Sequence, residues 1–196
     1  MENIIEKAKK HCLNLLKKSR CRFLPFHNVE HTMQVYESVL KIGAYEERDI
    51  QELEPVLLAA LFHDTGNATE FKGHENLSAI EANHFLAAIN YPLALTILVI
   101  GCINATRMPP EPKNSLEKII CDADLFHLGT NSFREKNKLL RIEWYKYWSI
   151  SYNDKEWTSL NILFLDQHKF HSKYGKEILE PLKQENLREL KLLALK

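Results

Sequence analysis

Apolar residues recur along almost the whole chain at the three- and four-residue spacing of helix faces, whereas strict alternation over the length of a strand is hard to find. This pattern predicts an all-α fold. The expected helices cover residues 2–19, 28–44, 53–64, 75–89, 93–106, 115–127, 132–152, 157–170 and 174–194.

Residues that start or stop helices support several of these boundaries. Asn28 is a good N-cap for the second expected helix, Pro55 suits the first turn of the third, and Gly66 follows the point where the third should end. The strongest breaker is the loop "RMPPEPKN", residues 107–114. Because both of its flanks are apolar and helical, we interpret it as a loop within one domain rather than a hinge.

A chain of 196 residues is long enough for one domain with a substantial core. We therefore expect residues 1–196 to form a single domain, with its core over about 23–133 and the C-terminal helices of 132–196 packing on that core.

The charge balance argues against a polyanionic partner, because 26 Lys and Arg residues are matched by 26 Asp and Glu residues. We expect neither nucleic acid nor a membrane. The N-terminus "MENIIEKAKKHC" lacks the apolar segment of a secretory signal, and the longest apolar run, Tyr91 to Ile103, is too short to span a bilayer. The four cysteines form no CxxC pair and are expected to be reduced, so a cytoplasmic location is predicted.

The stretch from Leu53 to Phe62 is apolar nearly all round, which predicts a helix through the middle of a bundle. It runs into His63 and Asp64, and two ionisable residues there are costly unless they are paired or bind something. A metal ion is one such partner. The imidazoles and carboxylates that could converge on one are His27, His31, His63, Asp64, His74, Glu75, Asp122 and Asp124.

Taken singly these residues are weak evidence, but their joint order is specific: His31 in a first helical turn, "HD" ending a core helix, and an aspartate in the later stretch "DADL". This order resembles the HD-domain superfamily of metal-dependent phosphohydrolases. "FHNVEHT", residues 26–32, is similar to the "YHN…H" signature of cyclic nucleotide phosphodiesterases, and "LAALFHDTG", "HENLS" and "IICDADLFHLG" look like a bacterial branch of HD phosphohydrolases. The resemblance covers roughly residues 23–133 and extends only loosely into the C-terminal third.

The resemblance implies an all-α bundle whose central helices hold a metal ion. Carried over to this chain, its ligands are His31, His63, Asp64 and Asp124. We favour Asp124 over Asp122 because the family's metal aspartate stands in an "A-D-x-L"-like context, here "ADLF". Asp122 would then support a ligand or face the substrate.

Two imidazoles and two carboxylates suit a divalent ion such as Mn²⁺, Fe²⁺, Co²⁺, Ni²⁺, Zn²⁺ or Mg²⁺ and leave positions open for water and a phosphate oxygen. Relatives with two ions carry further histidines. His74 and Glu75 could help to hold a second ion, but Arg107 and Met108 stand where another histidine is expected. We therefore expect one ion per chain, with a second ion as the alternative.

The phosphodiesterase motif implies a catalytic role for His27, because the first histidine of "HN…H" is the proton donor there; the alternative is a loop residue that caps nearby backbone. Asp64 could accept a proton from the attacking water as well as bind the ion. Arg107 and Lys113 either hold substrate phosphate or lie in solvent.

Other conspicuous residues have plainer interpretations. The aromatic stretch "WYKYW", residues 144–148, is typical of a core rather than of a stacking platform, and Arg141 and Glu143 just before it can pair with each other or across helices. His127, three residues after Asp124, can line the pocket. Five histidines are expected at the surface, with the pocket wall as the alternative place for His127: His11, His84, His127, His168 and His171.

These observations lead to one main hypothesis, the hydrolysis of a phosphoester or phosphoanhydride bond in a small substrate, above all a nucleotide, by water that a metal ion activates. One alternative is a regulatory or nucleotide-sensing module with a structural ion. The other is a di-iron oxygenase, which needs a fuller ligand set than residues 74–122 offer. The oligomeric state is open, and a homodimer is compatible with the sequence.

Overall fold

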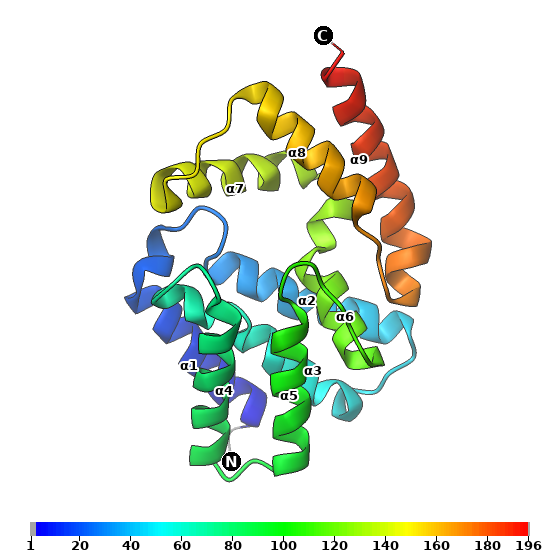
Figure 1. The fold of residues 1–196 in the computed structure, drawn as a ribbon. Helices are drawn as coiled ribbons and strands as arrows, with labels where there is room; N and C mark the ends of the chain where they lie inside the picture. The colour runs from blue at the N-terminus through cyan, green and yellow to red at the C-terminus, as the bar shows by residue number, and fades with distance from the viewer. Residues whose placement is uncertain (1–2, 196) are drawn as a thin grey trace.

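The computed structural model describes residues 3–195, which form a bundle of α-helices joined by short 3₁₀ and π-helical segments, with no strand in this part of the chain (Figure 1). The α-helices are α1 (Ile4–Lys18), α2 (Val29–Tyr45), α3 (Ile50–Phe62), α4 (His74–Ala88), α5 (Leu93–Ala105), α6 (Ser115–Asp124), α7 (Phe133–Trp148), α8 (Asp154–Gln167) and α9 (Glu180–Leu193). The shorter segments are η1 (Arg20–Phe23), η2 (Thr65–Ala68), η3 (Phe126–Gly129) and η4 (Gly175–Leu179). The all-α prediction is confirmed, and each expected helix corresponds to one of the α-helices.

Helix α3 runs through the middle of the bundle and packs against α1, α2, α5 and α6. It begins at Ile50, earlier than expected, because Asp49 and Glu52 form a capping box, so Pro55 lies inside the helix rather than in its first turn. Every side chain from Val56 to Phe62 is fully buried. Each buried Val, Leu or Phe contributes about 1.5–3 kcal/mol, so the C-terminal end of α3 is held firmly in place.

Three helices expected in the C-terminal half end three or four residues early, and the one predicted over 132–152 ends at Trp148. The helix predicted over 115–127 ends at Asp124, and η3 follows it. The helix predicted over 157–170 covers Asp154–Gln167 instead, because Asn153 forms a capping box with Glu156 at its start. His168 then has extended backbone angles (φ −65°, ψ 137°), so the helix stops before it.

Helices α7, α8 and α9 lie together at one end of the molecule, and α9 packs against α8 and η3 (Figure 1). Asp122 of α6 attaches the segment before α9. Its carboxylate accepts hydrogen bonds from the backbone N–H groups of His171 (2.9 Å) and Ser172 (2.8 Å) and from the Ser172 hydroxyl (2.6 Å). A Cβ added at Gly175 would lie 2.1 Å from Asp122 Oδ2, so this contact requires glycine.

All four cysteines are buried with free thiols, as the sequence predicted. Between residues 3 and 195, no helix combines the length and the apolar character needed to cross a membrane.

Candidate metal centre

The first turn of α2 presents His31, and Asn28 fixes where that turn begins. The Asn28 side-chain oxygen accepts hydrogen bonds from the backbone N–H groups of Glu30 (2.8 Å) and His31 (3.2 Å), and its amide nitrogen donates to Leu24 O (3.0 Å). The predicted N-cap is therefore present. By closing the loop before α2, it also sets the direction of the buried His31 ring.

The end of α3 presents His63 and Asp64. The His63 backbone still donates to Ala59 O (2.8 Å), whereas Asp64 (φ −106°, ψ 2°) has left the helix. The turn that follows packs against α4, because Gly66 N donates to Ser78 Oγ (2.9 Å) and a Cβ at Gly66 would lie 2.0 Å from a backbone oxygen of α4. This close approach explains why glycine follows the "HD" pair.

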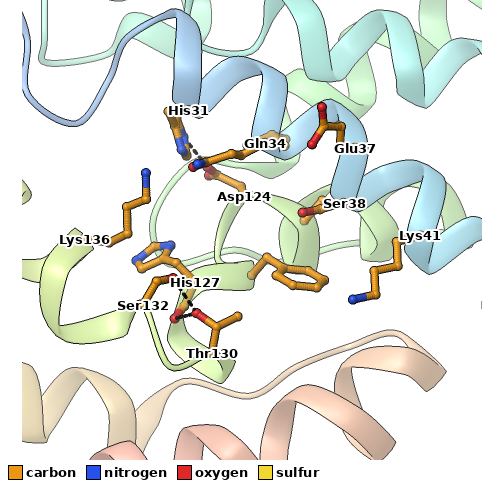
Figure 2. A pocket seen from close by; sticks show the side chains of 13 residues that line it. His31, Gln34, Glu37, Ser38, Lys41, Asp124, His127, Thr130, Ser132 and Lys136 are labelled. Carbon is orange, nitrogen blue, oxygen red and sulfur yellow. Dashed lines mark hydrogen bonds and ion pairs between the residues drawn. The ribbon is translucent and has the colours of Figure 1, made fainter.

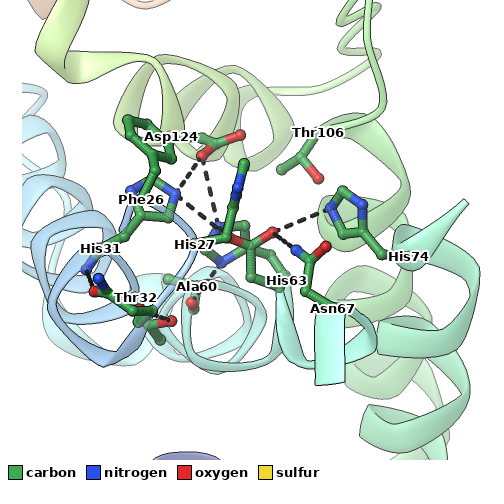
Figure 3. Close-up of polar contacts among 12 residues, drawn as sticks. Phe26, His27, His31, Thr32, Ala60, His63, Asn67, His74, Thr106 and Asp124 are labelled. Atoms are coloured by element: carbon green, nitrogen blue, oxygen red, sulfur yellow. Dashed lines mark hydrogen bonds and ion pairs between the residues drawn. The ribbon is translucent and has the colours of Figure 1, made fainter. Parts of the chain in front are cut away.

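His31, His63 and Asp124, from three helix ends, converge on one point (Figure 3), and Asp64 contacts both histidines there. His31 Nε2 lies 3.1 Å from Asp124 Oδ1 and 3.5 Å from Asp64 Oδ2. His63 Nε2 lies 3.4 Å from Asp64 Oδ2 and 3.5 Å from Asp124 Oδ1. Two ligands about 2.1 Å from one ion lie about 3.0 Å apart at a right angle and about 3.4 Å apart at the tetrahedral angle. These separations therefore suit a single small divalent ion.

His31 Nε2 and Asp124 Oδ1 are within hydrogen-bond distance of each other (3.1 Å), whereas the other two central atoms of the cluster have no such partner. His63 Nδ1 is 2.8 Å from Ala60 O, and a carbonyl can only accept, so the ring donates there and a neutral imidazole carries a lone pair on Nε2. Both His63 Nε2 and Asp64 Oδ2 are buried without a hydrogen-bond partner. Unpartnered buried acceptors are costly, and an ion at the centre would satisfy both.

Opposite charges shift the pKa values within the cluster. Burial lowers the pKa of His63, but the Asp64 and Asp124 carboxylates outweigh burial and raise it well above its ordinary value. Burial raises the pKa of Asp64, but the surrounding histidines outweigh it and hold that pKa well below the ordinary value. The carboxylates therefore stay ionised, and a proton competes with a metal ion for His63 Nε2.

His74, the first residue of α4, approaches the other oxygen of Asp64, with 3.1 Å between His74 Nε2 and Asp64 Oδ1. Asn67 Nδ2 donates to the same oxygen (3.2 Å). Burial lowers the pKa of His74, but its contact with Asp64 outweighs burial and raises it to about 9. Glu75 is buried, yet it makes no ion pair with the cluster in the described part of the chain.

His27 lies beside the cluster and is held by a residue that the sequence did not single out for this site. Glu143 of α7 is fully buried, and its carboxylate accepts hydrogen bonds from the backbone N–H groups of Phe26 (2.8 Å) and His27 (3.0 Å). Its other oxygen lies 2.5 Å from His27 Nδ1. The His27 ring centroid is 5.7 Å from that of His31 and 6.3 Å from that of His74.

The environment of His27 favours its protonated form. Burial lowers its pKa, but the charges of Asp64 and Glu143 outweigh burial and raise it. Of the two alternatives for Arg141 and Glu143, the structure has the second: they do not pair with each other, because Glu143 contacts His27 Nδ1 and Arg141 Nη1 contacts Asp154 Oδ1 (2.7 Å).

Several other candidates lie away from the cluster. Asp122 faces the segment before α9 and neither supports a ligand nor lines the cavity described below. Arg107 is exposed and donates to Asn76 Oδ1 (2.7 Å), and Lys113 is exposed in the loop before α6; neither lines that cavity. His168 is buried rather than exposed, so the surface interpretation was wrong.

A cavity of about 300 Å³ opens beside the cluster, between α2, η3 and the start of α7 (Figure 2). His31 and Asp124 lie at its wall, and His127 lines it as expected. The aromatic residues of the stretch 144–148 lie elsewhere and are not core as expected, because Tyr145 is exposed and the others are half-buried. Trp144 contacts Trp157 edge to face, with 5.5 Å between ring centroids, and Trp148 stacks on Phe71 at 4.3 Å.

A comparison of the sequence with protein-family models finds one matching family, the HD domain. The HD domain matches residues 28–129, a little more than half of the chain, and this segment contains His31, His63 and Asp124 as well as Asp64, which contacts both histidines. Searches of curated proteins and of solved structures gave no match. The helical architecture, the His/Asp cluster between the central helices and the match to the family agree, and the chain belongs to the HD domain family.

Proposed function

We propose that the protein hydrolyses a phosphoester or phosphoanhydride bond in a small phosphorylated substrate, and we favour a nucleotide as its class. The observation that carries this proposal is the group of His31, His63 and Asp124, with Asp64 in contact with both histidines and two unpartnered acceptor atoms, beside a cavity of ligand size. The family, whose members are mostly metal-dependent phosphohydrolases, supports the same class of reaction.

His31, His63, Asp64 and Asp124 would hold one divalent ion, of the series Mn²⁺, Fe²⁺, Co²⁺, Ni²⁺, Zn²⁺ or Mg²⁺. When bound, such an ion supplies a Lewis acid for the phosphoryl oxygens and lowers the pKa of water. Asp64 uses Oδ1 for His74 and Asn67, which leaves Oδ2 for the ion or for a proton from the attacking water.

His27 is the proposed proton donor to the leaving group. Glu143 accepts a hydrogen bond from Nδ1 of the ring, so the second proton of the imidazolium sits on Nε2. As the bond from phosphorus to the leaving oxygen breaks, that oxygen takes the Nε2 proton while the hydroxyl of the attacking water stays on phosphorus. Asp64 and Glu143 raise the pKa of His27, which favours the protonated ring that a proton donor requires.

The test is phosphate release by protein loaded with each divalent ion in turn, measured on a panel of nucleotides and on aryl phosphates. We expect His27→Ala to lower turnover by about 10²–10⁴-fold, the range of general acid–base catalysis, without loss of the ion. His84→Ala is the matched control, because His84 is an exposed histidine of α4 outside the cluster. No phosphate release from any compound by protein shown to contain the ion would contradict the proposal.

The same experiment separates the alternative functions. A nucleotide sensor would bind nucleotide without turnover, and His27→Ala would leave its affinity unchanged. A di-iron oxygenase would contain two irons per chain after aerobic purification, whereas we expect one ion, because the second Asp64 oxygen is already in contact with His74 and Asn67.

A further inference from the structure

The cavity beside the cluster has a distribution of charge that restricts the substrate further. Figure 2 shows Lys136 and Lys41 at opposite ends of it, with the cluster residues His31 and Asp124 along one side. At about 300 Å³ the cavity is at the small end of the range for ligand sites, which suits a sugar phosphate or a mononucleotide.

Lys136, on α7, is the lysine near the cluster. Its side chain is 15% exposed, and Nζ lies 3.0 Å from an oxygen of Glu30, whose side chain is 69% exposed. An ion pair with such an exposed carboxylate contributes only about 0–1 kcal/mol, so a phosphate oxygen can replace Glu30 at little cost. Lys136 is therefore available to the phosphoryl group that the cluster would hold.

Lys41, near the C-terminal end of α2, is the lysine at the remote end. No carboxylate pairs with it in the described part of the chain. Its Nζ lies 5.4 Å from the ring centroid of Phe126 and 5.6 Å from that of Tyr174, which places the ammonium beside two aromatic faces. Lys41 is exposed, and Glu37, one turn earlier on α2, lines the same cavity without forming an ion pair with it, so the ammonium group is available to an anion in the cavity.

Polar and aromatic groups line the space between the two lysines. The hydroxyls of Ser38, Thr130 and Ser132 face it, and the Phe126 ring forms part of its wall. The Thr130 and Ser132 hydroxyl oxygens are 2.8 Å apart. Hydroxyls and one ring suit the polar body of a small phosphorylated molecule better than a large apolar group.

We infer that the substrate carries a second anionic group, remote from the phosphoryl group that reacts, and that Lys41 binds it. Lys136 binds the reacting end, so the cavity selects small molecules with a phosphate at both ends. Lysine binds phosphate as a point charge, which fits both positions. This inference rests on the proposed function, because the reacting end is defined by the cluster.

The test compares matched pairs: fructose 1,6-bisphosphate with fructose 6-phosphate, and adenosine 3′,5′-bisphosphate with adenosine 5′-monophosphate. We expect kcat/KM to favour the bisphosphate by roughly tenfold, as one charge-assisted contact provides, in at least one pair. Lys41→Gln should reduce this ratio to about one. Lys173→Gln is the matched control and should keep the ratio, because Lys173 also lies over a tyrosine ring, 5.6 Å from the Tyr45 centroid, but does not line the cavity.

A binding measurement keeps this inference separate from the proposed function. Calorimetry on metal-free protein should give tighter binding of the bisphosphate than of the monophosphate, and Lys41→Gln should abolish the difference. If no compound is hydrolysed but this difference is found, the proposed function fails and the second anionic subsite stands. If phosphate is released without any preference for bisphosphates, or if Lys41→Gln leaves the preference intact, the inference is wrong.

Discussion

Replacing Glu143 by glutamine tests the contact that holds His27. The glutamine amide has the same shape, so its oxygen can keep the hydrogen bonds from the backbone N–H groups of Phe26 and His27. Its NH₂ group then faces His27 Nδ1, which can no longer donate there. Hydrogen bonds to charged groups contribute about 1.5–3 kcal/mol each, so we expect Glu143→Gln to lower the free energy of unfolding by about 2 kcal/mol.

The loss should depend on pH, and the pKa shifts give its sign. The pKa of His27 is raised in the folded state. Its contribution to the free energy of unfolding is therefore fully present below the pKa of the unfolded state and is lost as pH rises through the folded pKa. Burial raises the pKa of Glu143, but the contact with His27 outweighs burial and lowers that pKa. The contribution of Glu143 to the free energy of unfolding is therefore lost as pH falls through its folded pKa. The effect of Glu143→Gln should therefore be largest between about pH 5 and pH 6.

Urea unfolding of the wild type and Glu143→Gln at about pH 5.5 and about pH 9 measures this effect. The control is Glu135→Gln, at an exposed position of the same helix, which should change stability by less than about 0.5 kcal/mol. If the protein is active, the basic limb of its pH–rate profile should also move to lower pH in Glu143→Gln, because His27 loses a negative partner. An equal loss of stability at both pH values, or no loss at all, would refute this account of His27.

Three further predictions concern the ion, acid stability and the attachment of α9. In equilibrium dialysis, His63→Ala should reduce bound metal from about one ion per chain to a trace. The affinity of the wild type for the ion should fall as pH is lowered from about 9 to 6, because protons compete for His63 Nε2. Both ring nitrogens of His168 are buried without partners, and burial, with repulsion from Lys183, lowers its pKa to about 4. The free energy of unfolding should thus fall by up to about 3 kcal/mol as pH drops from the unfolded pKa of His168, about 6.5, toward pH 4. His168→Leu should remove this loss and so flatten the pH dependence of Tm. Gly175→Ala should lower the free energy of unfolding by about 1–3 kcal/mol in urea, because its Cβ would overlap Asp122, and an unchanged midpoint would contradict that clash.

The features that could be predicted from the sequence are those with local causes. Helix positions follow from apolar spacing, and the direction of His31 follows from the Asn28 cap three residues earlier. The buried position of His63 and Asp64 follows from the apolar run that precedes them. Each of these signals lies within a few residues of its effect, so one sequence is enough to detect it.

Glu143 has no such signal, because its partners are more than a hundred residues away. A carboxylate among aromatic residues on α7 could face solvent, pair with Arg141 or enter the core, and only the packing of α7 against the loop before α2 decides among them. The error at His168 has another physical origin. The spacing of His168 and His171 indicates one helix face only if the chain is helical there, and α8 ends at Gln167.

Helix geometry also limits the choice between Asp122 and Asp124. Residues two positions apart on a helix are separated by about 200° around its axis, so only one of the two carboxylates can face a given ion. The structure directs Asp124 to the cluster and Asp122 to the backbone of His171 and Ser172, on the other side of α6. The same helix thus carries a candidate metal ligand and the attachment of α9. The partners of Asp122, and Glu143 beside the cluster, lie outside the segment that matches the family, so the C-terminal third of the chain contacts both α6 and His27.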